Sequence, residues 1–362
     1  MLTILSFVLV MGIIVFVHEL GHFISAKRSN IIVDEFGFGF PPRVVRLAER
    51  NGTIYSLNAI PLGGFVRMRG EDDPDLPGSF AAASKKARAL TLLAGALMNF
   101  ALAIVLFSAR TAITGVPDTS RAGAIVAAVS AGSPAEQAGI QAGDRIVIAG
   151  DSAIDSIAAL QENTQRNAGQ PVTYKVMRSV DGVETEVELV MTPRVNPPEN
   201  QGALGIQIGE PMRPATIGEI LWSGIETTSQ IIWLTFALPV MLLTQGASVS
   251  ELGFMGPVGI AATTGDVVRS ALATDTLLPV IWFTGLLSVA IGITNLLPIP
   301  GLDGGRLIFV IVEAVRGRRV EPAQEGLIHL LGIGVLLFLV GIVTIREVTA
   351  LVNGTFPGLG LP

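Results

Sequence analysis

The 362-residue sequence contains no cysteine, which excludes disulfide bonds, thiolate metal ligands and a cysteine nucleophile. Only 15% of the residues are charged, whereas a soluble domain of this size carries about a quarter. Half of the residues are hydrophobic, and the shortage of charge is concentrated in a few long apolar runs. The chain is therefore predicted to be an integral membrane protein with an aqueous domain attached.

Four apolar runs are long enough to span a bilayer, which takes about 20 residues. They are approximately Leu2–Ala26, Ala89–Ala109, Leu277–Pro300 and Leu327–Ile345. The first run lacks the basic stretch and the small-residue cleavage site of a signal peptide, so we expect it to be a retained span. Basic residues gather between the first two runs and between the last two, which places both loops in the cytoplasm and Thr111–Thr276 outside.

A fifth stretch, Ile220–Thr244, is polar in its first half and apolar in its second. A span at this point would reverse every later segment and place the arginines of 316–319 outside, against the positive-inside rule. We therefore expect an amphipathic helix pair on the outer membrane face, within an extracytoplasmic helical connector at 211–275.

The loop between the first two spans is expected to contain a β-hairpin. Within Ile31–Arg69, apolar and polar residues alternate on both sides of Asn51-Gly52, a dipeptide typical of tight hairpin turns. The segment 31–69 is thus predicted to form a small cytoplasmic sheet beside the first span.

Residues 115–210 carry the signals of a mixed α/β domain. Strands are expected at "AGAIVAAVS", "GDRIVIAGD", Val172–Met177 and Glu184–Met191, with a helix near Ile157–Asn167 and a turn at Asp181-Gly182. This order, and particularly "SPAEQAGIQAGDRIVIAGD", resembles the PDZ family in its bacterial, circularly permuted form.

The PDZ resemblance implies a peptide-binding loop, and "GALGI" is the matching stretch. Its residues are Gly202, Ala203, Leu204, Gly205 and Ile206. Their backbone N–H groups would face a peptide carboxylate, and the neighbouring strand edge would take up the peptide as an added strand. A plain strand turn is the alternative interpretation of this stretch.

Histidine is also scarce, since the chain has three, and two of them lie in the first apolar run as "HELGH". His18 and His22 are four residues apart and share one helix face, with Glu19 beside them. This spacing suits a zinc site, in which neutral imidazole nitrogens converge from one side. Glu19 is suited to take a proton from water on the metal. The alternative, a chance match in an apolar helix, leaves an ionisable cluster at membrane depth unexplained.

Zinc needs a third protein ligand, and the third span ends in "NLLPIPGLDGG". Pro298 and Pro300 break the helix, and the glycines 301, 304 and 305 are expected to make a tight irregular turn around Asp303. If one span separates the first from the third, Asp303 and the histidines reach the same leaflet. His329, the remaining histidine, is interpreted as an interfacial or packing residue rather than a ligand.

The motifs "HELGH", "AGALMNF", the PDZ-like unit, "GPVGIA" and "NLLPIPGLDGG", in this order, resemble the site-2 protease family of intramembrane zinc metalloproteases. The similarity is greatest to its bacterial PDZ-containing branch, whose members cut membrane-anchored anti-sigma factors and leftover signal peptides. The resemblance implies Zn²⁺ as the cofactor, with His18, His22 and Asp303 as its ligands and Glu19 as the catalytic acid/base.

The same resemblance extends to the substrate. It implies that Asn295 positions the substrate or stabilises the oxyanion and that Asn99 of the second span lies close to the site, so both are candidate substrate-binding residues. The hairpin would hold an unwound substrate as an added strand. Ala96 stands where the family usually has proline, which weakens any specific role for that turn.

The expected fold class is a membrane α-helical protein with four transmembrane helices, a small cytoplasmic membrane-associated β-hairpin sheet and one extracytoplasmic α+β PDZ domain. Helices one and two lie in 1–110, and three and four in 276–362. The expected function is intramembrane proteolysis in a bacterial cytoplasmic membrane. Its partners are single-span or signal-peptide substrates, the lipid bilayer and a peptide or carboxyl terminus at the PDZ domain, without nucleic acid. A metal transporter or a catalytically silent PDZ scaffold is the alternative, although transporters typically show more spans and internal repeats.

Overall fold

The protein is described here by a computed structural model that covers residues 1–71, 73–118, 123–180, 183–198, 201–209, 211–245 and 255–354. The chain divides into two compact units, one of Met1–Thr111 with Ile220–Pro362 and one of Ala112–Glu219. The predicted turn at Asp181-Gly182 lies outside the described residues.

Among the described residues, four helices are long and apolar enough to cross a membrane. They are α1 (Leu2–Arg28), α2 (Lys85–Thr114), α7 (Leu278–Leu296) and α9 (Pro322–Val352). All four belong to the first unit or begin in it, and they coincide with the four apolar runs predicted as spans. The third ends earlier than expected, because Pro298 and Pro300 lack the N–H groups that would continue the helix.

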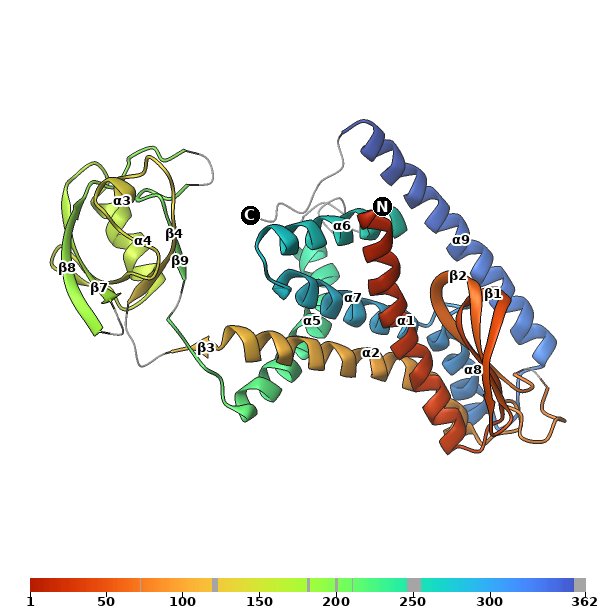
Figure 1. Cartoon of the computed structure of the whole chain (residues 1–362). Coiled ribbons are helices and arrows are strands. Elements are labelled where there is room, and N and C mark those ends of the chain that lie inside the picture. The colour runs from red at the N-terminus through yellow and green to blue at the C-terminus, as the bar shows by residue number, and fades with distance from the viewer. Residues whose placement is uncertain are drawn as a thin grey trace. The chain divides into compact units, whose positions relative to one another are not determined.

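Helix α1 lies between the hairpin sheet and the helices α6 (Pro257–Ala273) and α7 (Figure 1). Near its N-terminus, Val10 packs in an apolar cluster with Val267 of α6. Near its C-terminus, Ala26 packs in a second cluster with Val33 of the sheet. The helix that carries both histidines is therefore fixed on two sides.

The hairpin consists of β1 (Val33–Arg50) and β2 (Thr53–Met68), which pair in antiparallel fashion. Asn51 and Gly52 form its turn with φ angles of 50° and 75°, as the sequence predicts. Both positive angles belong to the left-handed region that asparagine and glycine tolerate best.

The hairpin is folded back on itself, so that β1 pairs with both ends of β2. Glu35 of β1 lies opposite Arg67 on one side and opposite Ile54 on the other. Gly64–Met68 therefore forms an outer strand, and no strand of the described chain pairs with its other side. We call Gly64–Met68 the edge strand.

Helix α5 (Ile217–Gln245) is one continuous helix, so the predicted helix pair at Ile220–Thr244 is wrong. Several polar residues of its first half form bonds within the helix, as Thr228 does by donating to the Gly224 carbonyl at 2.8 Å. The helix crosses α2 closely, because a Cβ on Gly224 would lie 2.4 Å from the carbonyl oxygen of Ile104. It is not among the four candidate spans.

Asp303 begins a helix, α8 (Asp303–Arg316), so the expected irregular turn around it is wrong in extent. The turn ends before Asp303, and the glycines that follow serve close packing instead. A Cβ on Gly304 would lie 2.3 Å from the carbonyl oxygen of Leu297, and a side chain on Gly305 would meet the same loop. The first turn of α8 thereby packs directly on the segment that precedes it.

The second unit contains a sheet with strand order β8-β7-β5-β4-β9. Its strands are β4 (Ala124–Val129), β5 (Arg145–Ala149), β7 (Val172–Val180), β8 (Val183–Met191) and β9 (Ile206–Gly209). Two helices belong to it, α3 (Pro134–Gln137) and α4 (Ile157–Arg166), with short strands β3 (Val116–Pro117), β6 (Ser152–Ala153) and β10 (Met212–Arg213). The predicted strands and the predicted helix are confirmed, although Ile206 begins β9 rather than ending a loop.

Candidate metal centre

Three side chains from distant parts of the chain place their ligand atoms together. Nε2 of His18 and Nε2 of His22 lie 3.1 Å apart, and each lies 3.1 Å from Oδ2 of Asp303. Both histidines are buried, and Asp303 is largely so, with 20% of its side chain exposed. The two motifs therefore meet, as the single intervening span at 89–109 predicts.

This triangle fits a zinc ion. Ligand atoms about 2.0 Å from a tetrahedral centre lie about 3.3 Å from one another, close to the separations observed. Two imidazole nitrogens and one carboxylate oxygen are a donor set that catalytic zinc sites use, with the fourth position left for water. Among the described residues, this is the one group of three such side chains that could hold a metal ion.

The tautomer of His22 is set by helix α2. Its Nδ1 lies 2.8 Å from the backbone carbonyl oxygen of Thr91, an acceptor only, so Nδ1 must carry the proton. Nε2 is then left with its lone pair facing the triangle, as metal binding requires. Outer contacts of this kind orient metal-binding imidazoles and fix their tautomer.

His18 has its outer contact with Asn99, whose carboxamide nitrogen lies 3.3 Å from Nδ1. Within the described chain, Oδ1 of Asn99 has no hydrogen-bond partner. Rotation of the amide exchanges its oxygen and nitrogen, which are assigned from the hydrogen-bond network. In the rotated orientation Oδ1 accepts from Nδ1–H of His18, and Nε2 of His18 is free to bind a metal.

Two glycines allow α1 and α2 to meet at the site. A Cβ on Gly95 of α2 would lie 2.5 Å from Nε2 of His22 and 2.7 Å from Nε2 of His18. A Cβ on Gly21 of α1 would lie 2.3 Å from the carbonyl oxygen of Ala94. Sequence reasoning gave neither glycine a role, although both lie inside motifs that it singled out.

Asp303 is positioned by the loop before it, and α9 holds that loop. The backbone N–H of Gly301 donates to Nδ1 of His329 at 2.8 Å. A Cβ on Gly332, one turn further along α9, would lie 2.4 Å from the carbonyl oxygen of Pro300. His329 is thus not part of the triangle, in keeping with its interpretation as a non-ligand. The contact of His329 with this loop was not predicted. Positions 329 and 332 share a helix face, which was a signal that both could contact the same segment.

Glu19 and Asn295 lie in the same cleft as the triangle, which the edge strand also lines. The cleft measures about 190 Å³ and is lined by polar side chains, with Val66 and Met68 on the side of the sheet. Asn295 donates one of its two carboxamide N–H groups to the carbonyl oxygen of Ile291 at 3.0 Å.

Asn99 does not lie where a substrate-binding residue is expected. It is fully buried behind His18 and is not among the residues that line the cleft. The structure therefore gives it a place as a partner of a histidine rather than of a substrate.

The predicted PDZ loop lies in the second unit, beside α4. Four of its residues line a pocket with α4, namely Gly202, Ala203, Leu204 and Ile206. Gly205 does not line the pocket and has a φ angle of 72°, in the region that favours glycine. The carbonyl oxygens of Ala203 and Leu204 accept from Arg194 and Ala135, which ties the loop to its neighbours.

The chain is similar to known proteins along nearly its whole length. Residues 6–339 match the model of Peptidase family M50. The protein named zinc metalloprotease RasP of Oceanobacillus iheyensis is 30% identical, over 97% of this chain and 100% of that protein. The RasP protein of Geobacillus kaustophilus is 28% identical, over 96% of this chain and 97% of its own. The chain belongs to peptidase family M50, a family of metallopeptidases.

Proposed function

We propose that this protein is a zinc-dependent intramembrane endopeptidase that cuts the transmembrane segments of single-span membrane proteins. The observation that carries the proposal is the triangle of donor atoms from His18, His22 and Asp303, set among helices that are long enough to span a membrane. Zinc is the proposed metal because the donor set suits it and because the relatives are named zinc metalloproteases.

The chemistry assigns separate roles to the side chains of the cleft. A bound zinc ion would supply a Lewis acid that activates water and polarises the scissile carbonyl group. The carboxylate of Glu19 accepts the proton of the attacking water and passes it to the leaving amine. The carboxamide of Asn295 has a second N–H group with which to bind the carbonyl oxygen as charge develops on it.

The edge strand is proposed to hold the substrate. A transmembrane helix protects its own peptide bonds, so the segment must unwind before it is cut. Val66 and Met68 of the edge strand line the cleft that contains Glu19, and the outer side of this strand offers backbone groups for strand addition. An extended substrate in this position would pass close to the candidate metal centre.

The second unit is proposed to be a PDZ domain on the outer side of a bacterial cytoplasmic membrane. Its pocket beside α4 would bind a carboxyl terminus, or the domain would exclude proteins with bulky outer parts. The proposed substrates are anti-sigma factors or remnant signal peptides, cut in regulated intramembrane proteolysis. What supports this placement is the distribution of basic residues and the resemblance of the unit to the PDZ family.

The test is co-expression with candidate single-span substrates, comparing the wild type with Glu19→Gln. Glu19→Gln keeps the three donor atoms, so we expect it to retain zinc while a membrane-bound precursor accumulates. His22→Ala removes a donor and should lose both zinc and cleavage. Metal content is measured on the purified proteins by mass spectrometry.

Two outcomes would contradict the proposal. Equal processing of every substrate by the wild type and Glu19→Gln would remove Glu19 from the chemistry. Equal zinc content of the wild type and His22→Ala would place the metal elsewhere.

A further inference from the structure

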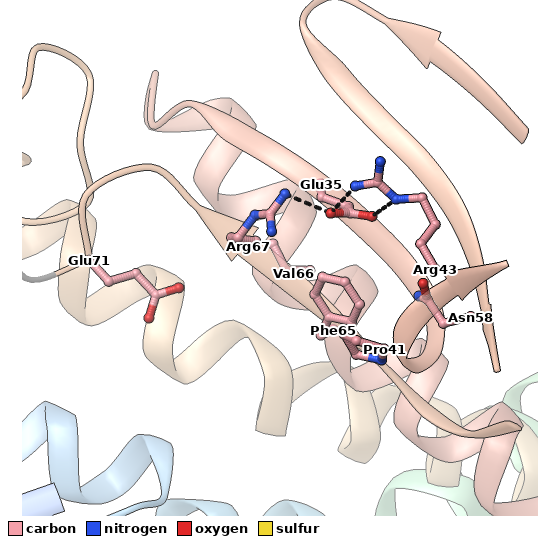
Figure 2. Close-up of a pocket in the computed structure, with 8 residues that line it drawn as sticks. All are labelled: Glu35, Pro41, Arg43, Asn58, Phe65, Val66, Arg67 and Glu71. Carbon is pink, nitrogen blue, oxygen red and sulfur yellow. Dashed lines mark hydrogen bonds and ion pairs between the residues drawn. The ribbon is translucent and has the colours of Figure 1, made fainter. Parts of the chain in front are cut away.

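A second pocket lies on the face of the hairpin sheet turned away from α1. Phe36 of β1 packs toward α1, in ring contact with Phe16 of that helix. Successive residues of a strand point to opposite faces, so Glu35 and its partner Arg67 lie on the other face. They line a pocket of about 490 Å³ together with Arg43 and Phe65 (Figure 2).

One buried carboxylate in this pocket meets two guanidinium groups. Glu35 has 3% of its side chain exposed. Arg43 grips both carboxylate oxygens, with Nε 2.8 Å from Oε1 and Nη2 2.6 Å from Oε2. Arg67 adds a single contact, from Nη2 to Oε2 at 2.7 Å. Figure 2 shows both arginines reaching Glu35 from opposite sides.

The carboxylate is already satisfied by Arg43. Burial raises the pKa of Glu35, but hydrogen bonds from Arg43 and Ser56 and the charges of both arginines outweigh it, so the pKa lies below its usual value and Glu35 is ionised. A two-pronged pair with one arginine is the strong form of this interaction. The pocket thus holds two positive charges and one negative charge. Because Arg43 already pairs with Glu35, the positive charge of Arg67 is not fully neutralised.

Arg67 is also the more accessible of the two, with 55% of its side chain exposed against 39% for Arg43. Glu71 lines the same pocket, but its carboxylate is held by Arg306 at 2.6 Å. The excess positive charge of the pocket therefore belongs to Arg67, which sits on the edge strand.

The pocket adjoins the cleft of the candidate metal centre. Val66 and Glu71 line both of them. We propose that the pocket is a substrate subsite that binds an acidic side chain close to the scissile peptide bond, with Arg67 as the residue that selects it. This inference rests on the proposed function, since it assumes that a peptide substrate lies on the edge strand.

The geometry of strand addition explains why Arg67 would select a side chain. A substrate strand beside Gly64–Met68 alternates its side chains between the two faces of the sheet. Side chains on the face of Arg67 lie directly beside it, about 5 Å away between Cβ atoms of opposed residues. A carboxylate at that position would meet the guanidinium group, and the ring of Phe65 would cover its methylene groups.

The test uses a single-span substrate that the wild type cuts, with Asp or Asn placed in turn at each position near the cleavage site. Asp and Asn have the same shape, so their ratio of kcat/KM isolates the charge. At one position we expect the wild type to prefer Asp by about fivefold, the upper range for a partly exposed ion pair. In Arg67→Gln the ratio should fall to about one, and in Arg67→Glu it should reverse.

Two control variants separate this role from a purely structural role of Arg67 in the sheet. Arg50→Gln, at the exposed hairpin turn, should keep the wild-type preference. Glu35→Gln should keep or increase this preference, because Arg67 retains its charge and the competing carboxylate is removed. If the pair of Arg67 and Glu35 only stabilises the sheet, Arg67→Gln and Glu35→Gln should each lower the cleavage of Asp and Asn substrates equally. That result, or a wild type without preference at any position, overturns the subsite while leaving the proposed protease intact. A wild type that cuts no substrate overturns the proposed function first.

Discussion

Two parts of the molecule supply the donor atoms of the metal centre, and they hold them by different means. Helix α1 carries His18 and His22 on an uninterrupted run of helix, so a spacing of four residues sets their relation. Asp303 follows the irregular segment 297–302, whose shape depends on contacts with α9. The histidines are therefore disturbed by intrusion into the site, whereas Asp303 can be disturbed from a helix outside it.

Helix α9, which contacts the loop before Asp303, is attached to the rest of the unit by few contacts. Glu347 is the only buried residue along its described length. The carboxylate of Glu347 accepts from the backbone N–H groups of Gly256 and Gly259, at 2.6 and 3.0 Å, at the start of α6. Towards the other end, His329 accepts from Gly301. Polar contacts near its two ends, rather than a broad apolar face, thus help to attach α9 to the unit.

The largest effect is expected from Gly95→Ala, which intrudes on the histidine side. The new methyl group would lie 2.5 Å from Nε2 of His22, in space that the imidazole occupies. Zinc affinity should fall by more than about 100-fold, since the ligands cannot keep their place. Zinc titration and cleavage assays measure the effect. Gly12→Ala is the matched control, because a Cβ there meets nothing within 4 Å, and it should behave as the wild type.

Retention of full zinc affinity by Gly95→Ala would show that the imidazoles have room to move away from α2. The histidines would then be adjustable, and the proposed contrast between them and Asp303 would fail. The melting temperature separates a loss of zinc affinity from a loss of folding, because overpacking costs about 1–3 kcal/mol and the gain in helix propensity returns only about 1 kcal/mol.

The histidine side of the site could be predicted from the sequence, and the reason is that its geometry is local. His18, Glu19 and His22 are related by helical periodicity alone. Gly95 could not be assigned a role, because its importance arises only when α2 approaches α1. Asn99 was placed near the site by resemblance, but its contact with His18 rather than with substrate depends on how deeply α2 is buried.

A smaller effect is expected from Asn99→Leu, which removes the outer partner of His18. The imidazole would lose the acceptor that holds its proton on Nδ1, and zinc affinity should fall by about 10- to 100-fold. Asn99→Asp keeps an acceptor of the same shape and should retain most of the affinity. Competition with a chelator of known affinity measures both. An unchanged affinity in Asn99→Leu would mean that packing alone fixes His18.

Elsewhere in the fold, too, features set by neighbouring residues were predicted, and features set by distant contacts were not. The hairpin was predicted because Asn51-Gly52 specifies its turn within two residues. Helix α5 was predicted as a pair because its polar first half contrasts with its apolar second half, yet its polar side chains bond within one helix. The start of α8 was missed because Gly304 and Gly305 suggest a turn, and only the packed loop shows that they permit close contact instead.

The smallest effect is expected from His329→Leu, which acts on the Asp303 side from α9. Without an acceptor for the Gly301 N–H, the loop before Asp303 loses one hydrogen bond, and kcat/KM should fall by about two- to tenfold. His329→Asn should restore much of the activity, because its carbonyl oxygen takes roughly the place of Nδ1. Leu337→Ala, at an exposed position of the same helix, is the control and should leave kcat/KM unchanged.

The variants of His329 also distinguish a positioning role from a general loss of stability. If His329 positions Asp303, the Leu variant releases zinc faster while its melting temperature changes little, and the Asn variant reverses the faster release. If His329 only packs, Leu and Asn should behave alike, and zinc release should follow the melting temperature. In that case α9 would not position Asp303. The histidines and Asp303 would then differ only in how deeply they are buried.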